Sequence, residues 1–270
     1  YSYDEDTGNV IASIDWGEVN ATDTGLFTDI GNDKVTTSIS YAEPTSNLYI
    51  TALVSAFIER NQSEVKVKEH RTYYDSLAFG QVSIGKPTKE EQWVQGSQYS
   101  AINRTYNSHG LMLTETDPRN NTTTYSYDSF ALHPVSVINA LGQVISYQYD
   151  YRIGQPFKIT DPNNLVSKFT FDGLGRIVKE EYTRPNQSDP NLLFVKKAFE
   201  YELYLHNNQV SGWKTLETNY LDNYDTAAPR ENQQITYTDG FGRSIQTRQL
   251  VEPSNGSTDQ RFRVIDTVYN

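Results

Sequence analysis

Three short stretches of the chain alternate aromatic and polar residues and end on aspartate. They are Tyr125-Ser126-Tyr127-Asp128, Tyr147-Gln148-Tyr149-Asp150 and Phe169-Thr170-Phe171-Asp172. Because successive side chains of a β-strand point to opposite faces, the alternation places both rings of each stretch on one face and the polar residue on the other. Aromatic residues also fit the pleated surface of a strand. The pattern predicts three strands that each carry two rings on one face.

These stretches recur at a constant interval of 22 residues, measured between their aspartates. A second mark keeps the same interval and is found at Asp117-Pro118, Asn139-Ala140 and Asp161-Pro162. A fixed period of this length is typical of a repeat whose units cannot bury their apolar faces alone and must stack on their neighbours.

Each period contains two strands joined by a turn. After Asp172, the glycines of Gly173-Leu174-Gly175 suit a turn that needs positive φ, and the chain resumes as a strand over 176–182. In the preceding period the second strand covers 154–160 and ends at Asp161-Pro162, where proline cannot donate to a ladder. We therefore predict an all-β fold of stacked antiparallel β-hairpins, about 22 residues per repeat, in one curved or spiralling sheet.

Weaker copies of the pattern divide the rest of the chain. We expect divergent hairpins with long loops over 1–71, the repeat array over 72–182, a divergent long hairpin inserted over 183–236, and a truncated continuation of the array over 237–270. We expect the chain to be part of a longer array. A separate small β domain is an open alternative for 1–71.

Within the divergent parts, local patterns predict individual elements. Strands are expected over 35–41, 48–54 and 64–68, and a hairpin of 199–205 with 212–218 is expected around 206–208. Turn-rich loops are expected over 15–18 and 23–25. The residues predicted to define the repeat structurally are Tyr74, Asp75, Tyr125, Tyr127, Asp128, Tyr147, Tyr149, Asp150, Phe169, Phe171, Asp172, Gly175, Arg176, Asp239, Gly242 and Arg243.

The phrase Tyr-x-Tyr-Asp, the Gly-Arg that closes the following turn and the Asp-Pro between units resemble the YD-repeat (Rhs) family. The resemblance is greatest to the B component of bacterial insecticidal Tc toxin complexes, with the teneurins more distant. It implies that the sheet is part of a hollow shell, which in Tc toxins encloses a cytotoxic polypeptide made by the C component. The implied protein is a bacterial, secreted one. No part of the chain matches the segment that cleaves itself in this family.

Composition restricts the classes of function. The formal charge of −11 disfavours nucleic-acid binding by a basic face. The absence of cysteine excludes disulfides and cysteine-ligated zinc. No apolar run is long enough to span a membrane. Hydrophobic residues make up 36% and tyrosines number 20, which suits a sheet faced with amphipathic rings better than a thick two-layer core.

Candidate catalytic groups do not combine into a known motif. The histidines, His70, His109, His133 and His206, lie in separate repeats without metal-ligand spacing. Asp4, Asp6 and Asn9 suit a turn better than a calcium loop, because the glycine and glutamate of such a loop are not at the required positions. The repeated aspartates fit a structural role, in which the carboxylate accepts hydrogen bonds from turn N–H groups. We predict no cofactor, no metal site and no catalytic residue.

The sequence thus predicts a non-catalytic segment of a shell wall, with the remainder of the repeat protein and an enclosed C-component polypeptide as partners. One alternative is a β module that binds carbohydrate or a cell-surface partner through exposed tyrosine and tryptophan. A glycan-cleaving enzyme is a third alternative, and it would require two carboxyl groups about 5 to 10 Å apart in a cleft.

Overall fold

The computed structural model describes residues 1–21, 24–45, 52–185, 192–207, 209–220, 231–251 and 261–267. Regular structure in these residues consists of β-strands, and none of them belongs to a helix that could cross a membrane. The chain divides into two compact units, residues 1–143 and 144–270, which are described separately.

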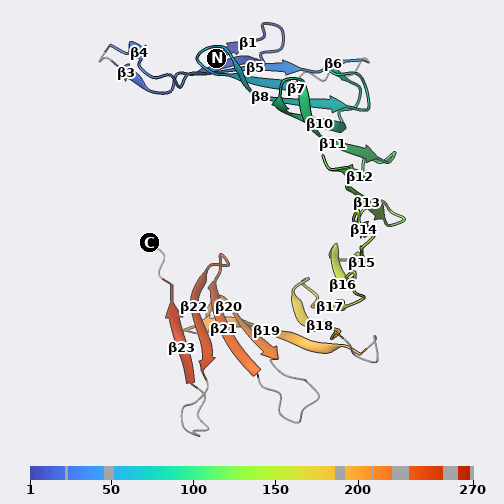
Figure 1. Cartoon of the computed structure of the whole chain (residues 1–270). Helices are drawn as coiled ribbons and strands as arrows, with labels where there is room; N and C mark the ends of the chain where they lie inside the picture. Colours follow the sequence, from blue (N-terminus) through green and yellow to red (C-terminus); the bar gives the residue numbers. More distant parts are fainter. Residues whose placement is uncertain are drawn as a thin grey trace. The chain divides into compact units, whose positions relative to one another are not determined.

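The first unit is an antiparallel ladder in which strands pair in the order β1, β2, β5, β7, β8, β10, β11, β12, β13, β14 (Figure 1). From β10 onward each strand pairs with the next in sequence, as stacked hairpins require. The strands of this ladder are β1 (Ser2–Tyr3), β2 (Val10–Asp15), β5 (Val35–Tyr41), β7 (Val54–Arg60), β8 (Lys66–Tyr74), β10 (Pro87–Gln95), β11 (Gln98–Tyr106), β12 (Met112–Thr116), β13 (Thr122–Tyr127) and β14 (Pro134–Ile138).

Two small strand pairs lie beside this ladder. A hairpin of β3 (Val19–Ala21) and β4 (Phe27–Asp29) follows β2. A parallel pair of β6 (Glu43–Pro44) and β9 (Gln81–Val82) ties the end of β5 to the loop after β8. At this second pair Ala42, Tyr74 and Val82 form a small buried cluster with Leu53 packed against it.

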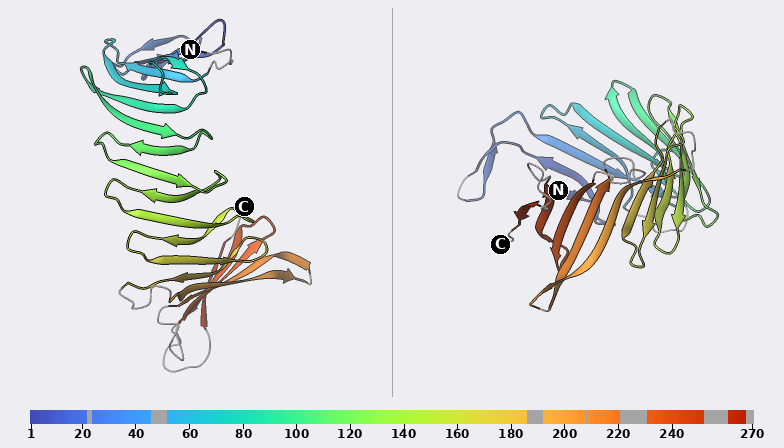
Figure 2. Two further views of the ribbon diagram at one scale, coloured as in Figure 1. Left: turned by 90° about the vertical axis from the view of Figure 1, so that its right-hand side faces the viewer. Right: turned by 90° about the horizontal axis from the view of Figure 1, so that it is seen from below.

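In the second unit, each strand pairs antiparallel with the next one along the chain from β15 to β18 and onward to β23 (Figure 2). The longest hairpin joins β19 to β20. The strands are β15 (Val144–Asp150), β16 (Gln155–Thr160), β17 (Val166–Phe171), β18 (Ile177–Tyr182), β19 (Phe194–His206), β20 (Gln209–Tyr220), β21 (Glu231–Asp239), β22 (Ser244–Val251) and β23 (Arg261–Asp266).

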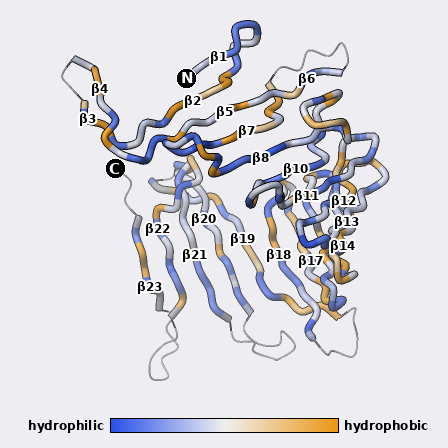
Figure 3. The backbone as a smooth tube through the Cα atoms, turned by 45° about the horizontal axis from the view of Figure 1, so that its top comes forward, coloured by the Kyte–Doolittle hydropathy of each residue, from blue (hydrophilic) through white to orange (hydrophobic). Residues whose placement is uncertain are grey.

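Both ladders are thin and bury little apolar surface. The buried apolar residues of the described chain are Ala42, Ala56, Tyr74, Val82 and Phe194. Most other strand residues are half-buried, and hydrophobic and hydrophilic positions are mixed along each strand (Figure 3). In β13, β15 and β17 the two rings are half-buried and the polar residue between them is exposed, as the alternation predicts. The predicted all-β fold of stacked antiparallel hairpins is confirmed.

Some local predictions need correction. The strand expected over 64–68 begins at Lys66, because Glu64 has a φ of 58° in the preceding turn. Of the strand expected over 48–54, residues 48–51 lie outside the described residues, and only Val54 of the remainder is in a strand, β7. Asp15 ends strand β2 rather than starting a loop. β8 pairs with β10, so β1, β2, β5, β7 and β8 belong to the same ladder as the repeats that follow within the first unit, whereas β3, β4 and β6 lie in the two small pairs beside it.

Candidate functional site

A single type of turn recurs at both ends of the hairpins. At Asp172 the backbone N–H donates to the carbonyl of Arg176 at 2.9 Å, and the N–H of Gly175 donates to the carbonyl of Asp172 at 3.1 Å. The Oδ1 atom of Asp172 also accepts the N–H groups of Leu174 and Arg176, each at 2.9 Å. The same four bonds form in the turns that begin at Asn61, Asn107, Asp117, Asn139, Asp161 and Asp239.

The fourth residue of this turn has positive φ. It is glycine in the turns after Asp172 and Asp239, where Gly175 has a φ of 78° and Gly242 a φ of 80°. In the Asp-Pro turns the fourth residue is asparagine, the other residue that tolerates this conformation. The two marks read from the sequence are therefore the same turn, Asp or Asn with Gly or Asn three residues later, at opposite ends of each hairpin. The turn at Asn61 has the same hydrogen bonds but carries Glu64, with a φ of 58°, at the fourth position, so the sequence pattern does not show it.

The turns at Asp128 and Asp150 are variants. The Asp128 turn is one residue longer and closes through a bond from its N–H to the carbonyl of His133 at 3.1 Å. The Asp150 carboxylate accepts the N–H of Arg152 at 3.0 Å and pairs with its guanidinium at 2.6 Å. At every one of these positions the carboxylate is used by its own turn.

Asp75 closes a much larger loop with the same chemistry. Its carboxylate accepts the backbone N–H groups of Ser83, Ile84 and Gly85 on Oδ2 and of Lys86 on Oδ1, at 2.8 to 2.9 Å. Burial alone would raise the pKa of Asp75, but these four donors outweigh it and hold that pKa below its ordinary value. The charge of Asp75 is thus used to fix the loop between β8 and β10.

Tyrosine hydroxyls form a second recurring contact. The last residue of β8, Tyr74, donates to the carbonyl of Val54, the first residue of β7, at 2.8 Å. Tyr106 donates to Pro87 at 2.9 Å and Tyr127 donates to Met112 at 2.8 Å, again from the end of one strand to the start of the preceding one. Tyr41 to Val10 repeats the arrangement, and Tyr201, in the middle of β19, likewise donates to the carbonyl of Ile177 at the start of β18. We call these contacts tyrosine bridges.

Each tyrosine bridge ties a strand to the preceding strand of the ladder. Burial raises the pKa of Tyr74, Tyr106, Tyr127 and Tyr201, so each hydroxyl keeps its proton and can donate. Phe171 occupies the equivalent position in β17, 44 residues after Tyr127, and lacks the hydroxyl. The repeat keeps the ring at this position even where the bridge is absent.

The remaining repeat residues pack around these contacts. Tyr147 and Tyr149 have ring centroids 6.3 Å apart, and Tyr125 and Phe169 lie on the corresponding faces of β13 and β17. Arg176 pairs with Asp172 at 2.7 Å, and its guanidinium lies 4.2 Å from the ring of Tyr201 on the next hairpin. Arg243 pairs with Asp239 at 2.7 Å and lies over Phe241 of its own turn. Both arginines therefore close their turns, and Arg176 also reaches the next hairpin.

A charged and aromatic cluster, which sequence reasoning missed, lies on the face of β8 opposite Tyr74. Glu69 is 3% exposed and accepts bonds from Lys66 at 2.7 Å, Arg71 at 2.6 Å and the Tyr99 hydroxyl at 2.8 Å. Burial would raise the pKa of Glu69, but its three donors lower it. The cations also cover rings, with Lys66 at 4.5 Å from Trp93 and Arg71 at 4.4 Å from Tyr99. One face of each ring is occupied and is not open for a sugar to stack on.

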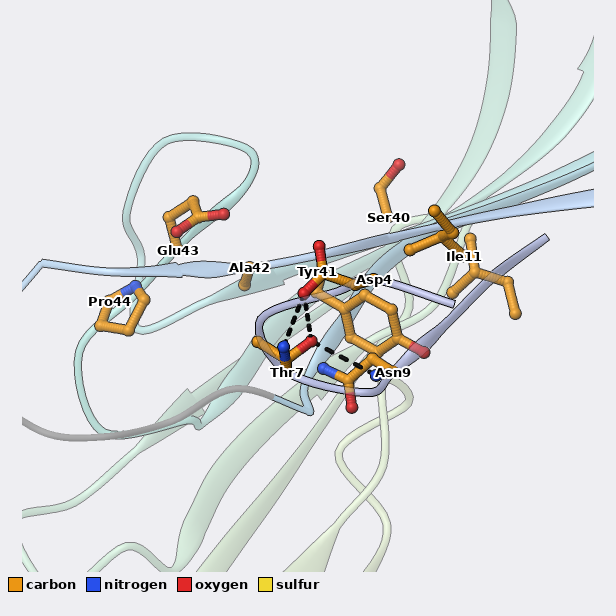
Figure 4. Close-up of a pocket in the computed structure, with 10 residues that line it drawn as sticks. Asp4, Thr7, Asn9, Ile11, Ser40, Tyr41, Ala42, Glu43 and Pro44 are labelled. Atoms are coloured by element: carbon orange, nitrogen blue, oxygen red, sulfur yellow. Dashed lines mark hydrogen bonds between the residues drawn. The ribbon is translucent and has the colours of Figure 1, made fainter. Parts of the chain in front are cut away.

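A cavity of 320 Å³ lies over the first hairpin and the end of β5 (Figure 4). Among its lining residues are Asp4, Thr7, Asn9, Tyr41 and Glu43. The Asp4 carboxylate accepts the hydroxyl and N–H of Thr7 at 2.6 and 2.8 Å, and these bonds lower its pKa. The turn predicted at Asp4 is present, and its carboxylate is engaged by that turn.

The described residues do not form a catalytic constellation. His70 stacks on Phe57, while His109 and His133 lie in different turns, and the side chain of His206 is outside the described part. No group of three His, Asp or Glu residues in the described part could hold a metal ion. Hydrogen bonds lower the pKa of Asp4, Glu69, Asp75, Asp117, Asp150, Asp172 and Asp239, whereas a glycosidase needs one carboxylic acid with a raised pKa.

Comparison with known proteins agrees with this description. A sequence-family profile described as RHS Repeat matches residues 106–130, which contain the Tyr125 to Asp128 phrase. No curated protein sequence matches the chain. The resemblance to Rhs repeats predicted from the sequence is thereby confirmed.

Solved structures share the fold. TcdB2–TccC3 aligns with a TM-score of 0.64 and 14% identity over 85% of this chain and 16% of its own. TcdB2–TccC3–Cdc42 gives 0.65 and 11%, over 85% and 19%. A Tc holotoxin pore from Photorhabdus luminescens gives 0.62 and 12%, over 87% and 18%. This chain therefore spans less than a fifth of the length of the chains that it matches.

Proposed function

Because this chain contains an RHS repeat and shares the fold of the TcdB2–TccC3 complexes, we propose that it is a wall segment of an RHS-repeat shell that encloses a polypeptide. The proposed assembly is a secreted bacterial toxin of the Tc type. The proposed partners are the remainder of the repeat protein and a C-component polypeptide inside the shell.

The observation that carries this proposal is the thinness of the sheet. In an ordinary globular domain, sheets and helices bury their apolar faces against another layer. Here only a few described residues are fully buried, and half-buried tyrosines, threonines and paired charges cover both faces. Such a sheet can stand with solvent or another protein on either side, which is what a container wall requires.

The recurring contacts suit a wall more than an active site. Each turn uses its Asp carboxylate or Asn amide oxygen internally, and each tyrosine bridge joins a strand of one hairpin to the preceding strand. Such a hairpin can be repeated along the sheet, because the strand edge that it offers to the next hairpin is like the edge on which it packs itself. We propose that 72–182 and 237–270 form continuous wall, that 183–236 is a longer hairpin inserted in it, and that the chain itself is non-catalytic.

Protease protection tests the proposal. Two complete repeat assemblies with the enclosed polypeptide would be treated with trypsin, one unsubstituted and one carrying Asp75→Ala. The substitution removes the acceptor of four loop N–H groups. We expect the enclosed polypeptide to survive in the unsubstituted assembly and to be digested faster once the wall is weakened. Digestion of that polypeptide at the same rate as when it is free would overturn the proposal.

A further inference from the structure

The first 33 residues have a charge unlike that of the rest of the chain. They include no Lys, Arg or His, and their acidic residues are Asp4, Glu5, Asp6, Asp15, Glu18, Asp23, Asp29 and Asp33. This segment thus contributes −8 of the formal charge of −11, and the other 237 residues contribute −3. Three of these acidic residues, Asp4, Glu5 and Asp6, lie in the turn between β1 and β2, whereas Asp15, Glu18, Asp29 and Asp33 lie in or next to β3 and β4. The next residue, Lys34, is a cation whose ammonium lies 5.2 Å from the centroid of the Trp16 ring.

Exposed apolar side chains gather in the same segment. Trp16 is 38% exposed, Phe27 48% and Ile30 53%, and Val19 and Leu26 are also exposed. Trp16 and Phe27 touch edge to face, with ring centroids 5.4 Å apart. Single exposed apolar residues are common on proteins, and Leu174 and Phe241 are examples at the tips of separate turns. Around β3 and β4 five exposed apolar residues lie within 15 positions of sequence, and a second group, Leu203, Leu205, Val210 and Trp213, lies around the turn between β19 and β20 but without the acidic residues of the first segment.

The hairpin of β3 and β4 projects beyond the ladder of the first unit (Figures 1 and 3). Its base is held by specific bonds: Asp33 accepts the N–H of Glu18 at 3.0 Å, and Gln62 donates to Asp29 at 3.2 Å. The Asp33 carboxylate lies so close to Gly17 and Gly31 that a Cβ on either would collide with it. The hairpin that carries the exposed apolar residues is therefore held in place at its base.

We infer that this hairpin is a docking element for a polypeptide partner whose contact surface has apolar residues flanked by lysine or arginine. An apolar centre with a charged rim is the usual anatomy of a protein interface, and the acidic rim would steer a basic partner toward it. Nucleic acid and anionic lipid would be repelled by a segment of charge −8, and a second copy of this chain carries the same acidic segment. This inference does not depend on the proposed wall function.

Fluorescence anisotropy with a labelled synthetic peptide tests the inference. The probe is a 14-residue amphipathic peptide of leucine and lysine, the comparison peptide has glutamate in place of lysine, and a lysine-only peptide reports on charge alone. We expect the full chain to bind the leucine–lysine peptide in preference to both others. Truncating Trp16→Ala and Phe27→Ala together should weaken that binding about tenfold or more, as loss of an interface anchor does.

Charge reversal gives a second, independent arm. The side chain of Glu18, directly before β3, makes no hydrogen bond or ion pair with described residues, so Glu18→Lys leaves the turn bonds of this segment in place. This variant should lose affinity for the leucine–lysine peptide and gain affinity for the leucine–glutamate peptide. Matched controls change similar groups elsewhere: Leu174→Ala with Phe241→Ala, and Glu64→Lys with Glu200→Lys. These controls should leave binding within about twofold of the starting chain.

Several results would overturn the inference. They are absence of binding to the leucine–lysine peptide, equal binding of the lysine-only peptide, equal losses in the control variants, and no change of preference on charge reversal. Binding of the chain to phosphatidylglycerol vesicles, lost in the Trp16 and Phe27 variant, would assign the hairpin to a membrane instead. Circular dichroism of each variant verifies that the β-sheet is retained, and the reversal arm decides the question if the truncated variant does not fold.

Discussion

The tyrosine bridges give the sharpest test of how the hairpins hold one another. Replacing Tyr106 and Tyr127 by phenylalanine keeps both rings and removes only two hydroxyls, which donate to the carbonyls of Pro87 and Met112 at 2.9 and 2.8 Å. A protein hydrogen bond contributes about 0.5 to 1.5 kcal/mol net. The half-buried setting lets water replace part of each bond, so we expect about 1 kcal/mol per substitution. Because the two bonds share no partner, the double variant should lose about 2 kcal/mol.

Hydrogen–deuterium exchange is the assay that resolves this effect. In a repeat array, stability is a sum of local terms, so a global melting temperature averages over many hairpins. A local loss of about 1 kcal/mol should raise the exchange rate of amides in β12 and β13 about fivefold in Tyr127→Phe. Amides of the second unit should exchange at their original rates.

The same strand offers a matched control. In the described part of the chain, the hydroxyl of Tyr125 makes no hydrogen bond, so Tyr125→Phe should leave exchange unchanged. Conversely, Phe171→Tyr places a hydroxyl opposite the carbonyl of Pro156, the position that corresponds to Met112, and should slow exchange in β16 and β17. Equal effects of Tyr125→Phe and Tyr127→Phe would refute the bridging role.

Three further predictions concern the turns and the buried charges. Asp75→Ala leaves four loop N–H groups without their acceptor and should destabilise the first unit by about 2 to 4 kcal/mol in urea unfolding. Gly175→Ala should lower the free energy of unfolding by about 1 to 2 kcal/mol, because φ is 78° and the new Cβ would lie 3.2 Å from Ile153. Gly173→Ala should lower it less, because a Cβ at that position meets open space. Glu69 and Asp75 have lowered pKa values, so the stability that their ionisation contributes is present above about pH 4.5 and is lost as the pH falls through their folded-state pKa values.

Each of these has a contrary outcome. Unchanged urea midpoints for Asp75→Ala would show that water replaces the carboxylate at no cost. If Gly173→Ala and Gly175→Ala lowered the free energy of unfolding equally, the positive φ of Gly175 would not be the cause. For the pH dependence, a Glu69→Gln variant should lose stability at pH 7 and show a shallower decline below pH 4.5. If the stability of that variant fell with pH below 4.5 as steeply as that of the unsubstituted chain, Glu69 would not be among the groups that cause the acid dependence.

The fold was predictable because its local signals agree with one another. Ring alternation, turn residues and a constant period all favour hairpins, and strand β5 over Val35–Tyr41 and the hairpin of β19 and β20 lie where the sequence predicted. The turn at Asn61 was missed because Glu64 takes the position of positive φ that glycine or asparagine usually occupies. Only the hydrogen bonds reveal that it is the same turn.

The long-range contacts could not be predicted, since they depend on register. The acceptor of a tyrosine bridge lies 15 residues before Tyr127 but 31 residues before Tyr41, so no fixed spacing points to it. The partners of Glu69 come from two strands, and Tyr99 lies 30 residues away. Strands β3 and β4 were not predicted individually, because they are three residues long and show no clear alternation.

Cryo-electron microscopy of an RHS-repeat assembly that contains this chain tests the central claim most directly. The account predicts that the hairpins of 87–138 and those of 144–182 are each a single layer of β-sheet, with one face toward an enclosed polypeptide and the other toward solvent, and with the tyrosine bridge of Tyr127 intact. Density that shows these hairpins covered on both faces by other layers of protein, or in a compact domain outside any shell, would contradict it.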